Sequence, residues 1–343
     1  MPSAIPIQNL YYLLCYAWDK LEQGSLIDIS GSENTELVDL FATVLCDGVK
    51  HLARRGLAQS YEGHAEEVAG IRGRIDFSTS MRRATFIRGH AFCHFDEITP
   101  NSEANRIIRT TLKSLLSAED LNSAVRKRVH RTCKGLNGIE EIDLSAALFN
   151  RVRVSGQQRF YRFLLNICEL IYDSLLVEEQ SGSKRFRDFT RDDGKMAQLF
   201  QSFLFNFISR ECSQWSAKVD HLRWCAESET DPELSLLPRM ATDISLYQSG
   251  RYLIVDAKYY QKTLSSYFGS EKIHSDNLYQ ILSYVLNASA QQGCPAEGML
   301  IYPTVDRHVR DSYQILGHRV SVCTVDLGQP WHAIDRELRQ LMQ

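Results

Sequence analysis

Apolar residues recur at helical spacing along much of the chain, and this pattern predicts most of its elements. Helical periodicity marks five stretches, residues 7–18, 37–52, 107–116, 158–177 and 195–212. Between residues 61 and 95 the spacing between apolar residues becomes shorter and glycines recur, which favours strands. The first half of the chain is therefore predicted to combine helices with a β-rich region.

The second half has a clear order of elements. After the helix at 195–212, the pattern predicts strands at 220–226, 238–247 and 252–260, a helix at 276–288, strands at 298–303 and 313–325, and a final helix from about residue 331. Strands and helices in this order indicate an α/β domain whose sheet is covered by helices.

The chain is long enough for two domains, because 343 residues exceed what one hydrophobic core usually serves. Residues 178–194 are polar and rich in charge, and they are the best candidate for a linker. We expect an N-terminal α+β domain over residues 1–155, a helix and linker over 156–194, and the α/β domain over 195–343.

Composition narrows the class of protein. The hydrophobic fraction of 44% and the charged fraction of 24% are those of a globular chain, and no apolar run reaches the ~18–20 residues that span a bilayer. No Lys or Arg precedes the apolar stretch at 7–18, which favours a buried helix over a signal peptide. The nine cysteines form no C-x-x-C pair, so we expect free thiols, no structural zinc and a cytoplasmic location without a membrane partner.

The net charge of −3 argues neither for nor against nucleic acid, but one local cluster is basic. Residues 101–162 hold 12 lysines and arginines against 6 acidic residues. The densest part of the cluster comprises Arg126, Lys127, Arg128, Arg131 and Lys134. Such a cluster fits either a nucleic-acid surface or a solvated helix face, and the sequence leaves both interpretations open.

Candidate chemistry is concentrated in residues 238–260. A hairpin turn centred on Ser249 and Gly250 would place Asp243 directly opposite Asp256, with their Cβ atoms ~4.5–5.5 Å apart. Lys258 lies two residues after Asp256 and so projects to the same side. Two carboxylates and one ammonium group are therefore expected to converge on one patch of sheet. The other face of the first strand is predicted to hold Met240, Thr242, Ile244 and Leu246.

Opposed carboxylates repel each other, so a fold tolerates them when a cation lies between them. Hard oxygen ligands suit Mg²⁺ or Mn²⁺, and Mg²⁺ typically takes one or two carboxylates plus water and phosphate oxygens. Asp243 and Asp256 are therefore candidate metal ligands, and Lys258 adds a positive charge that can stabilise a transition state. A D-x-K triplet alone carries little information, and an ordinary ion pair between Asp256 and Lys258 is the competing interpretation.

The aspartate, hairpin and D-x-K arrangement, with a helix before and after it, resembles the PD-(D/E)xK nuclease superfamily. The resemblance implies a restriction-endonuclease-like domain with a central mixed sheet flanked by helices. It also implies that Asp243, Asp256 and Lys258 are catalytic and that the two aspartates bind the metal ion.

A further part of this resemblance lies on the following helix, where Gln280 and Tyr284 match the Q-x-x-x-Y element of some branches. Their spacing puts them on one face, which we expect to lie opposite the apolar stripe. The alternative is a pair of polar residues on an exposed face. Many superfamily members carry a glutamate ligand on the first core helix, where this chain has Gln201.

Five segments along the chain carry a more specific resemblance, residues 5–18 (IPIQNLYYLLCYAW), 70–77 (GIRGRIDF), 104–109 (ANRIIR), 238–260 and 271–280 (EKIHSDNLYQ). Through them almost the whole chain is similar to the McrC family, the nuclease subunits of McrBC modification-dependent restriction systems. The resemblance implies a partner, a hexameric AAA+ GTPase of the McrB type that recognises modified cytosine in double-stranded DNA. It also implies that the N-terminal half docks on this ring and stimulates GTP hydrolysis.

The chain contains neither G-x-x-x-x-G-K-[ST] nor G-x-G-x-x-G, so we do not expect it to bind a nucleotide itself. The leading hypothesis is a Mg²⁺-dependent DNA endonuclease subunit that acts with a GTPase on DNA containing 5-methylcytosine. One alternative is a stand-alone PD-(D/E)xK repair nuclease. Another is a non-catalytic activator of the GTPase that only grips DNA.

Overall fold

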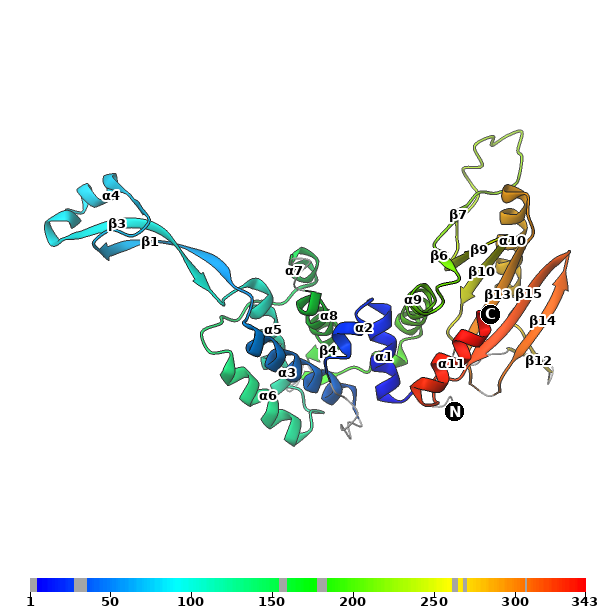
Figure 1. The fold of residues 1–343 in the computed structure, drawn as a ribbon, viewed down its shortest axis with the longest axis horizontal. Helices are drawn as coiled ribbons and strands as arrows, with labels where there is room; N and C mark the ends of the chain where they lie inside the picture. Colours follow the sequence, from blue (N-terminus) through cyan, green and yellow to red (C-terminus); the bar gives the residue numbers. More distant parts are fainter. Residues whose placement is uncertain are drawn as a thin grey trace. The chain divides into compact units, whose positions relative to one another are not determined.

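The computed structural model describes residues 5–27, 36–153, 159–177, 184–260, 265–267, 270–305 and 307–343. It divides into two compact units (Figure 1), of which unit 1 comprises Met1–Glu33 with Asp188–Gln343 and unit 2 comprises Asn34–Arg187. The helices and strands confirm the predicted mixed α/β class. Within the described ranges, no helix is both long and apolar enough to cross a membrane.

Unit 1 is built on a six-stranded mixed sheet. Its strand order is β14 (Arg310–Ile315), β15 (His318–Val325), β13 (Ala296–Pro303), β10 (Arg251–Ala257), β9 (Ile244–Gln248) and β6 (Ser216–Lys218). The three central strands β15, β13 and β10 are parallel, and the outer pairings are antiparallel. The predicted single strand at 313–325 is wrong, because Leu316 and Gly317 adopt positive φ and turn the chain into a hairpin.

Helices cover both faces of this sheet. Helix α10 (Ser275–Gln292) packs on β10 and β13, where Ile281 and Val285 share a buried core with Tyr252 and Ile254. Side chains alternate along a strand, so Val255 points to the other face. It is also buried there, on the side where α9 (Asp193–Glu211) contacts β10. Helix α11 (Trp331–Leu341) contacts β15.

The close approach of α10 to the sheet depends on Gly298 in β13. A Cβ added there would lie 2.8 Å from Ile281 Cγ1 and 3.0 Å from Val285 Cγ2. Both distances are too short for ordinary packing. The glycine therefore sets how closely α10 can lie over β10 and β13.

The N-terminal helix α1 (Ile7–Ala17) belongs to unit 1, which corrects the predicted domain boundary at residue 155. It packs on α9 and is followed by α2 (Leu21–Gly24). The buried Asn9 amide donates hydrogen bonds to the carbonyl oxygens of Leu327 (2.8 Å) and Gln329 (2.7 Å). These contacts span more than three hundred residues of sequence, which is why local periodicity could not predict them.

Unit 2 combines a helical core with a three-stranded sheet. The buried Asn105 links the two ends of the β1–β3 pair to the helices. Its amide donates to the carbonyl oxygens of Ala58, before β1, and Pro100, after β3, and its side-chain oxygen accepts from the Tyr161 hydroxyl. Figure 1 shows β1 and β3 extending away from the helices of this unit as an arm, with α4 at its far end. The elements are α3 (Leu37–Arg55), β1 (Ser60–Ala69), β2 (Arg74–Ile75), α4 (Phe77–Arg82), η1 (Thr85–Arg88), β3 (His90–Thr99), α5 (Glu103–Leu116), α6 (Ser123–Gly135), α7 (Ala146–Arg151), α8 (Arg159–Ser174), β4 (Leu175–Val177) and β5 (Lys184–Phe186).

The linker predicted at 178–194 is partly wrong. Residues 178–183 lie outside the described residues, but β5 pairs with β4, and η3 (Phe189–Arg191) leads directly into α9. Asp192 caps α9 by accepting from the backbone N–H groups of Gly194 and Lys195. The remaining short strands are β7 (His221–Leu222), β8 (Met240–Ala241), β11 (Ser265–Tyr267) and β12 (Ser270–Lys272).

Candidate active site

The hairpin of β9 and β10 has the predicted register. Tyr252 pairs with Tyr247 and Val255 pairs with Ile244, and Gly250 makes the turn with φ 74°. Asp243 lies one residue before β9 and thus next to the end of this pairing. Its Oδ2 accepts a hydrogen bond of 2.9 Å from the backbone N–H of Ala257. The local sequence therefore brings Asp243 beside the segment that carries Asp256.

The predicted faces of the first strand are only partly correct. Alternation does not continue from Met240 to Ile244, because the chain leaves the strand at Thr242 and Asp243. Thr242 instead donates its backbone N–H to the Asp220 carbonyl at 3.0 Å. Met240 consequently packs in the core cluster that faces α10.

Asp256 is the most unusual group of the site. Its residue is only 1% exposed, and neither carboxylate oxygen accepts a hydrogen bond from the described residues. The ammonium of Lys258 lies 3.0 Å from Oδ2 as an ion partner. Burial raises the pKa of Asp256 to about 6, with Lys258 opposing this shift and the charge of Asp243 adding to it.

The neighbouring charges are shifted by the same environment. Burial raises the pKa of Asp243, although the Ala257 N–H and the charge of Lys258 both act to lower it. Burial alone would lower the pKa of Lys258, but the carboxylates of Asp256 and Asp243 outweigh it, so that the pKa is raised. The lysine therefore stays protonated at neutral pH, as the ion partner of the buried Asp256 carboxylate.

Gln280 and Tyr284 extend the site onto α10. Gln280 Oε1 accepts a hydrogen bond of 2.8 Å from Lys258, and Gln280 Nε2 donates one of 3.0 Å to the Tyr284 hydroxyl. The expectation that both lie opposite the apolar stripe is wrong for Tyr284. This tyrosine is buried in the core with Ile281 and Val285, and only its hydroxyl reaches back to Gln280.

Comparison with known proteins places the chain in a family. Residues 7–303 match the family described as McrBC 5-methylcytosine restriction system component. The chain belongs to this family. It is 38% identical over 334 residues to the type IV methyl-directed restriction enzyme EcoKMcrBC of Escherichia coli K12, covering 97% of this chain and 96% of the relative. The resemblance to the McrC family is thereby confirmed.

A solved structure shows the same fold. It is a half-complex from a tetradecameric assembly of Thermococcus gammatolerans McrB AAA+ hexamers with bound McrC. The match has a TM-score of 0.65 at 17% identity and covers 98% of this chain and 75% of that chain. At 17% identity the match shows the fold alone, and the roles of individual side chains are argued from the geometry of the site.

The donor set of this McrBC family member fits a divalent cation. Asp256 supplies two oxygens without hydrogen-bond donors, and Asp243 supplies a second, half-buried carboxylate. Among the described residues, no group of three or more His, Cys, Asp or Glu side chains could hold a metal. Two carboxylates with water and phosphate oxygens are the set that Mg²⁺ usually takes. Glu211, the last residue of α9, is held by Arg339 at 2.5 Å and by the Tyr16 hydroxyl.

Sequence reasoning missed three residues near the charged groups of the site, which are Asn277, Tyr260 and Tyr302. The buried Asn277 accepts from the Tyr260 hydroxyl (3.1 Å) and donates to the Tyr302 hydroxyl (3.0 Å). It thereby ties α10 both to β13 and to the chain just after Lys258. The only sequence signal was the position of Asn277, three residues before Gln280 and so on the same helical face.

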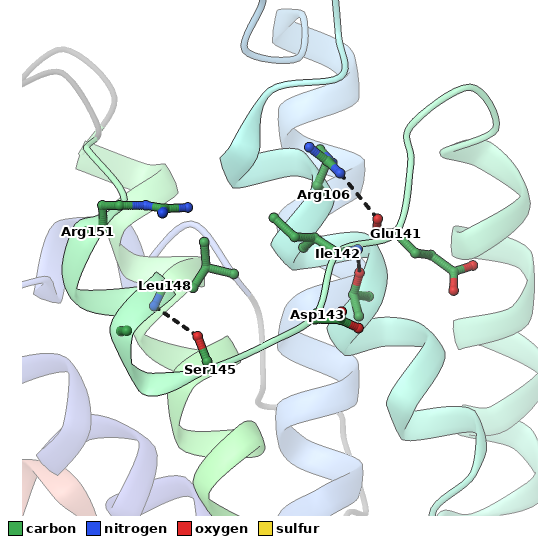
Figure 2. Close-up of a pocket in the computed structure, with 9 residues that line it drawn as sticks. Arg106, Glu141, Ile142, Asp143, Ser145, Leu148 and Arg151 are labelled. Atoms are coloured by element: carbon green, nitrogen blue, oxygen red, sulfur yellow. Dashed lines mark hydrogen bonds between the residues drawn. The ribbon is translucent and has the colours of Figure 1, made fainter.

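A pocket of about 570 Å³ in unit 2 contains none of these residues (Figure 2). Its two arginines are engaged in ion pairs, Arg106 with Glu140 at 3.5 Å and Arg151 with Glu103 at 2.8 Å. The Arg106 guanidinium also donates to the Glu141 carbonyl. These arginines therefore organise the surface around α5 and α7, whereas Asp243, Asp256 and Lys258 lie in unit 1.

Proposed function

We propose that this chain is the Mg²⁺-dependent endonuclease subunit of a restriction complex directed at DNA containing 5-methylcytosine. The observation that carries the proposal is the carboxylate of Asp256, which is buried without hydrogen-bond donors beside Asp243 and Lys258. One ammonium group, that of Lys258, faces the two carboxylates of Asp256 and Asp243, so a second cation would compensate the remaining negative charge. Membership of the McrBC family supplies the restriction context.

Each polar group of the site can be given a role. Asp243 and Asp256 would hold the metal ion, which when bound lowers the pKa of a water and neutralises charge on the phosphate. Lys258 remains charged and can stabilise the negative charge that develops on the scissile phosphate. Gln280 fixes the direction of the lysine through its 2.8 Å contact. Cytoplasmic location and the absence of nucleotide binding stay predictions.

The proposed partner is an AAA+ GTPase ring of the McrB type, because a solved complex of similar fold contains such hexamers. We assign the docking surface to the end of the arm in unit 2. Large apolar side chains are exposed there, including Ile87 at 87% and Met81 at 73%, with Phe77 also exposed. Exposed apolar groups that cluster in this way usually mark protein–protein contacts. This surface would transmit the stimulation of GTP hydrolysis.

The test is Mg²⁺-dependent cleavage of a cytosine-methylated plasmid in the presence of the partner GTPase and GTP. We expect cleavage by the wild type and no product above background for Asp256→Ala or Asp243→Ala, while stimulation of GTP hydrolysis is retained. Asp311→Ala is the matched control, because Asp311 is exposed on β14 of the same unit. It should cleave like the wild type.

Other outcomes of this cleavage assay would favour one of the alternative functions. Cleavage by the chain without the GTPase would favour a stand-alone nuclease. Stimulation of GTP hydrolysis without any cleavage by the wild type would favour a non-catalytic activator. Loss of both activities in a folded Asp256→Ala protein would contradict the division of roles between the two units.

A further inference from the structure

Helix α6 in unit 2 carries the basic cluster of the sequence, and the structure divides this cluster into two groups. Arg126 turns back and donates to the carbonyl oxygens of Ala118 (2.6 Å) and Leu121 (3.3 Å) beyond the end of α5. Arg128 pairs with Asp47 of α3. These two arginines therefore join α6 to its neighbours and are not available to a partner.

The other cationic residues of α6 face solvent. Lys127, Arg131 and Lys134 are exposed, and within the described part of the chain no ion pair engages them. Their spacing of i, i+4 and i+7 places them on one face of the helix. Together with His130, Leu116 and the stem of Arg126 they line a groove of about 590 Å³. The groove is thus lined by cations on an apolar floor, without a carboxylate.

Acidic residues are absent from this face. The sequence contains no Asp or Glu from residue 121 to residue 139. The carboxylates that flank this stretch are paired elsewhere, Asp120 with Arg185 at 3.9 Å and Glu140 with Arg106 at 3.5 Å, and Asp47 of α3 pairs with Arg128. Like charges at i, i+4 repel each other and destabilise a helix. The surface therefore carries a concentrated positive charge that no ion pair among the described residues of unit 2 compensates.

We propose that this face of α6 binds the phosphate backbone of double-stranded DNA; the choice of DNA as its partner rests on the proposed function. Lys127 and Lys134 are seven residues apart, or about 10 Å along the helix axis, so their side chains can reach several phosphates at once. Lysine and arginine bind phosphates independently of base sequence. The surface would hold DNA in place for a partner that reads the modified base.

The test measures binding of the full-length chain to a short fluorescent DNA duplex by anisotropy, in EDTA and without the GTPase, at several salt concentrations. For Lys127→Glu/Arg131→Glu/Lys134→Glu we expect an affinity at least about tenfold weaker at low salt. We also expect the slope of log affinity against log salt to fall by about 3, the value for three phosphate contacts. The loss should be equal for methylated and unmethylated duplexes.

Two further variants and one further readout make the test specific. Lys127→Arg/Arg131→Lys/Lys134→Arg keeps the charge and should bind like the wild type. Lys127→Gln/Arg131→Gln/Lys134→Gln avoids repulsion between new carboxylates and should show the same loss to a smaller degree. Circular dichroism establishes that each variant is folded, and stimulation of the GTPase should be unchanged.

The competing outcomes are distinct. Unchanged DNA affinity with reduced GTPase stimulation would make α6 a protein-docking face and overturn the proposal. Unchanged values for both would leave a solvated helix face and also overturn it. Binding is measured without metal or cleavage, so the two proposals can fail separately. If the wild type does not cleave DNA but the charge-reversed variant still binds DNA more weakly than the wild type, the proposed nuclease is refuted and this surface is not.

Discussion

Lys258, the residue after β10, and Gln280 of α10 are joined by a 2.8 Å hydrogen bond, in which the lysine ammonium donates to the amide oxygen. The same ammonium lies 3.0 Å from the carboxylate of Asp256. Gln280 is itself fixed by its bond to the buried Tyr284. The lysine is therefore positioned from two sides, by the sheet and by the helix that covers it.

Gln280 is accordingly expected to act as a positioning residue. Gln280→Leu removes the acceptor at similar volume and should lower the kcat for DNA cleavage about 10- to 100-fold, as loss of an outer contact to a catalytic group typically does. The KM for DNA should stay close to that of the wild type, and Tyr284→Phe should have a smaller effect. A rise in KM at unchanged kcat would instead assign Gln280 to DNA binding.

The raised pKa of Asp256 predicts the pH dependence of stability in the metal-free protein. The folded state retains the Asp256 proton up to about pH 6, whereas an unfolded aspartate loses it near 3.8, so this group's contribution to stability is lost as pH rises between these values. Asp256→Asn removes the titration. Its stability relative to the wild type in EDTA should increase by about 2 kcal/mol from pH 4 to pH 7.

Denaturant unfolding at a series of pH values measures this difference. Added Mg²⁺ should stabilise the wild type at pH 7 and should leave Asp256→Asn almost unaffected. A difference that is constant with pH would show that the carboxyl group is not desolvated as the structure indicates.

Gly298 predicts a coupling between packing and activity. Gly298→Ala places a methyl group against Ile281 and Val285 and should destabilise the protein by about 1–3 kcal/mol through overpacking. Because Gln280 precedes Ile281 on α10, cleavage should fall at temperatures where the protein remains folded. Gly135→Ala is the control, since a Cβ there meets nothing within 4 Å. Equal behaviour of the two variants would refute the assigned role of Gly298.

Asn9 tests the assignment of the N-terminal helix to unit 1. Asn9→Ala leaves the carbonyl oxygens of Leu327 and Gln329 without this donor and should cost about 1–3 kcal/mol. Hydrogen exchange should accelerate in α1, α9 and α11 and remain unchanged in α3 and α5 of unit 2. The exposed Asn137→Ala should alter neither set. Faster exchange confined to unit 2 would contradict the assignment.

How much the sequence could predict differs between parts of the site. The strand period and the turn at Gly250 are local, so the register that brings Asp243 to the Asp256 segment followed from the residues themselves. The break at Thr242 depends on Asp220, more than twenty residues away, and no local period contains it. Asn277 was missed for the same reason, because its partners Tyr260 and Tyr302 lie on other elements.

The sequence by itself predicted the longer helices of both units apart from α6, and it predicted the β9–β10 hairpin. It also proposed Asp243, Asp256 and Lys258 as site residues, since each of these predictions depends on spacing within a short segment. Only the tertiary structure decided that α1 packs on α9, that Tyr284 is buried and that Arg126 and Arg128 are engaged while Lys127, Arg131 and Lys134 are exposed. These features depend on which surfaces meet when distant elements pack. Burial and the pairing of charges are properties of those contacts, and a one-dimensional pattern does not contain them.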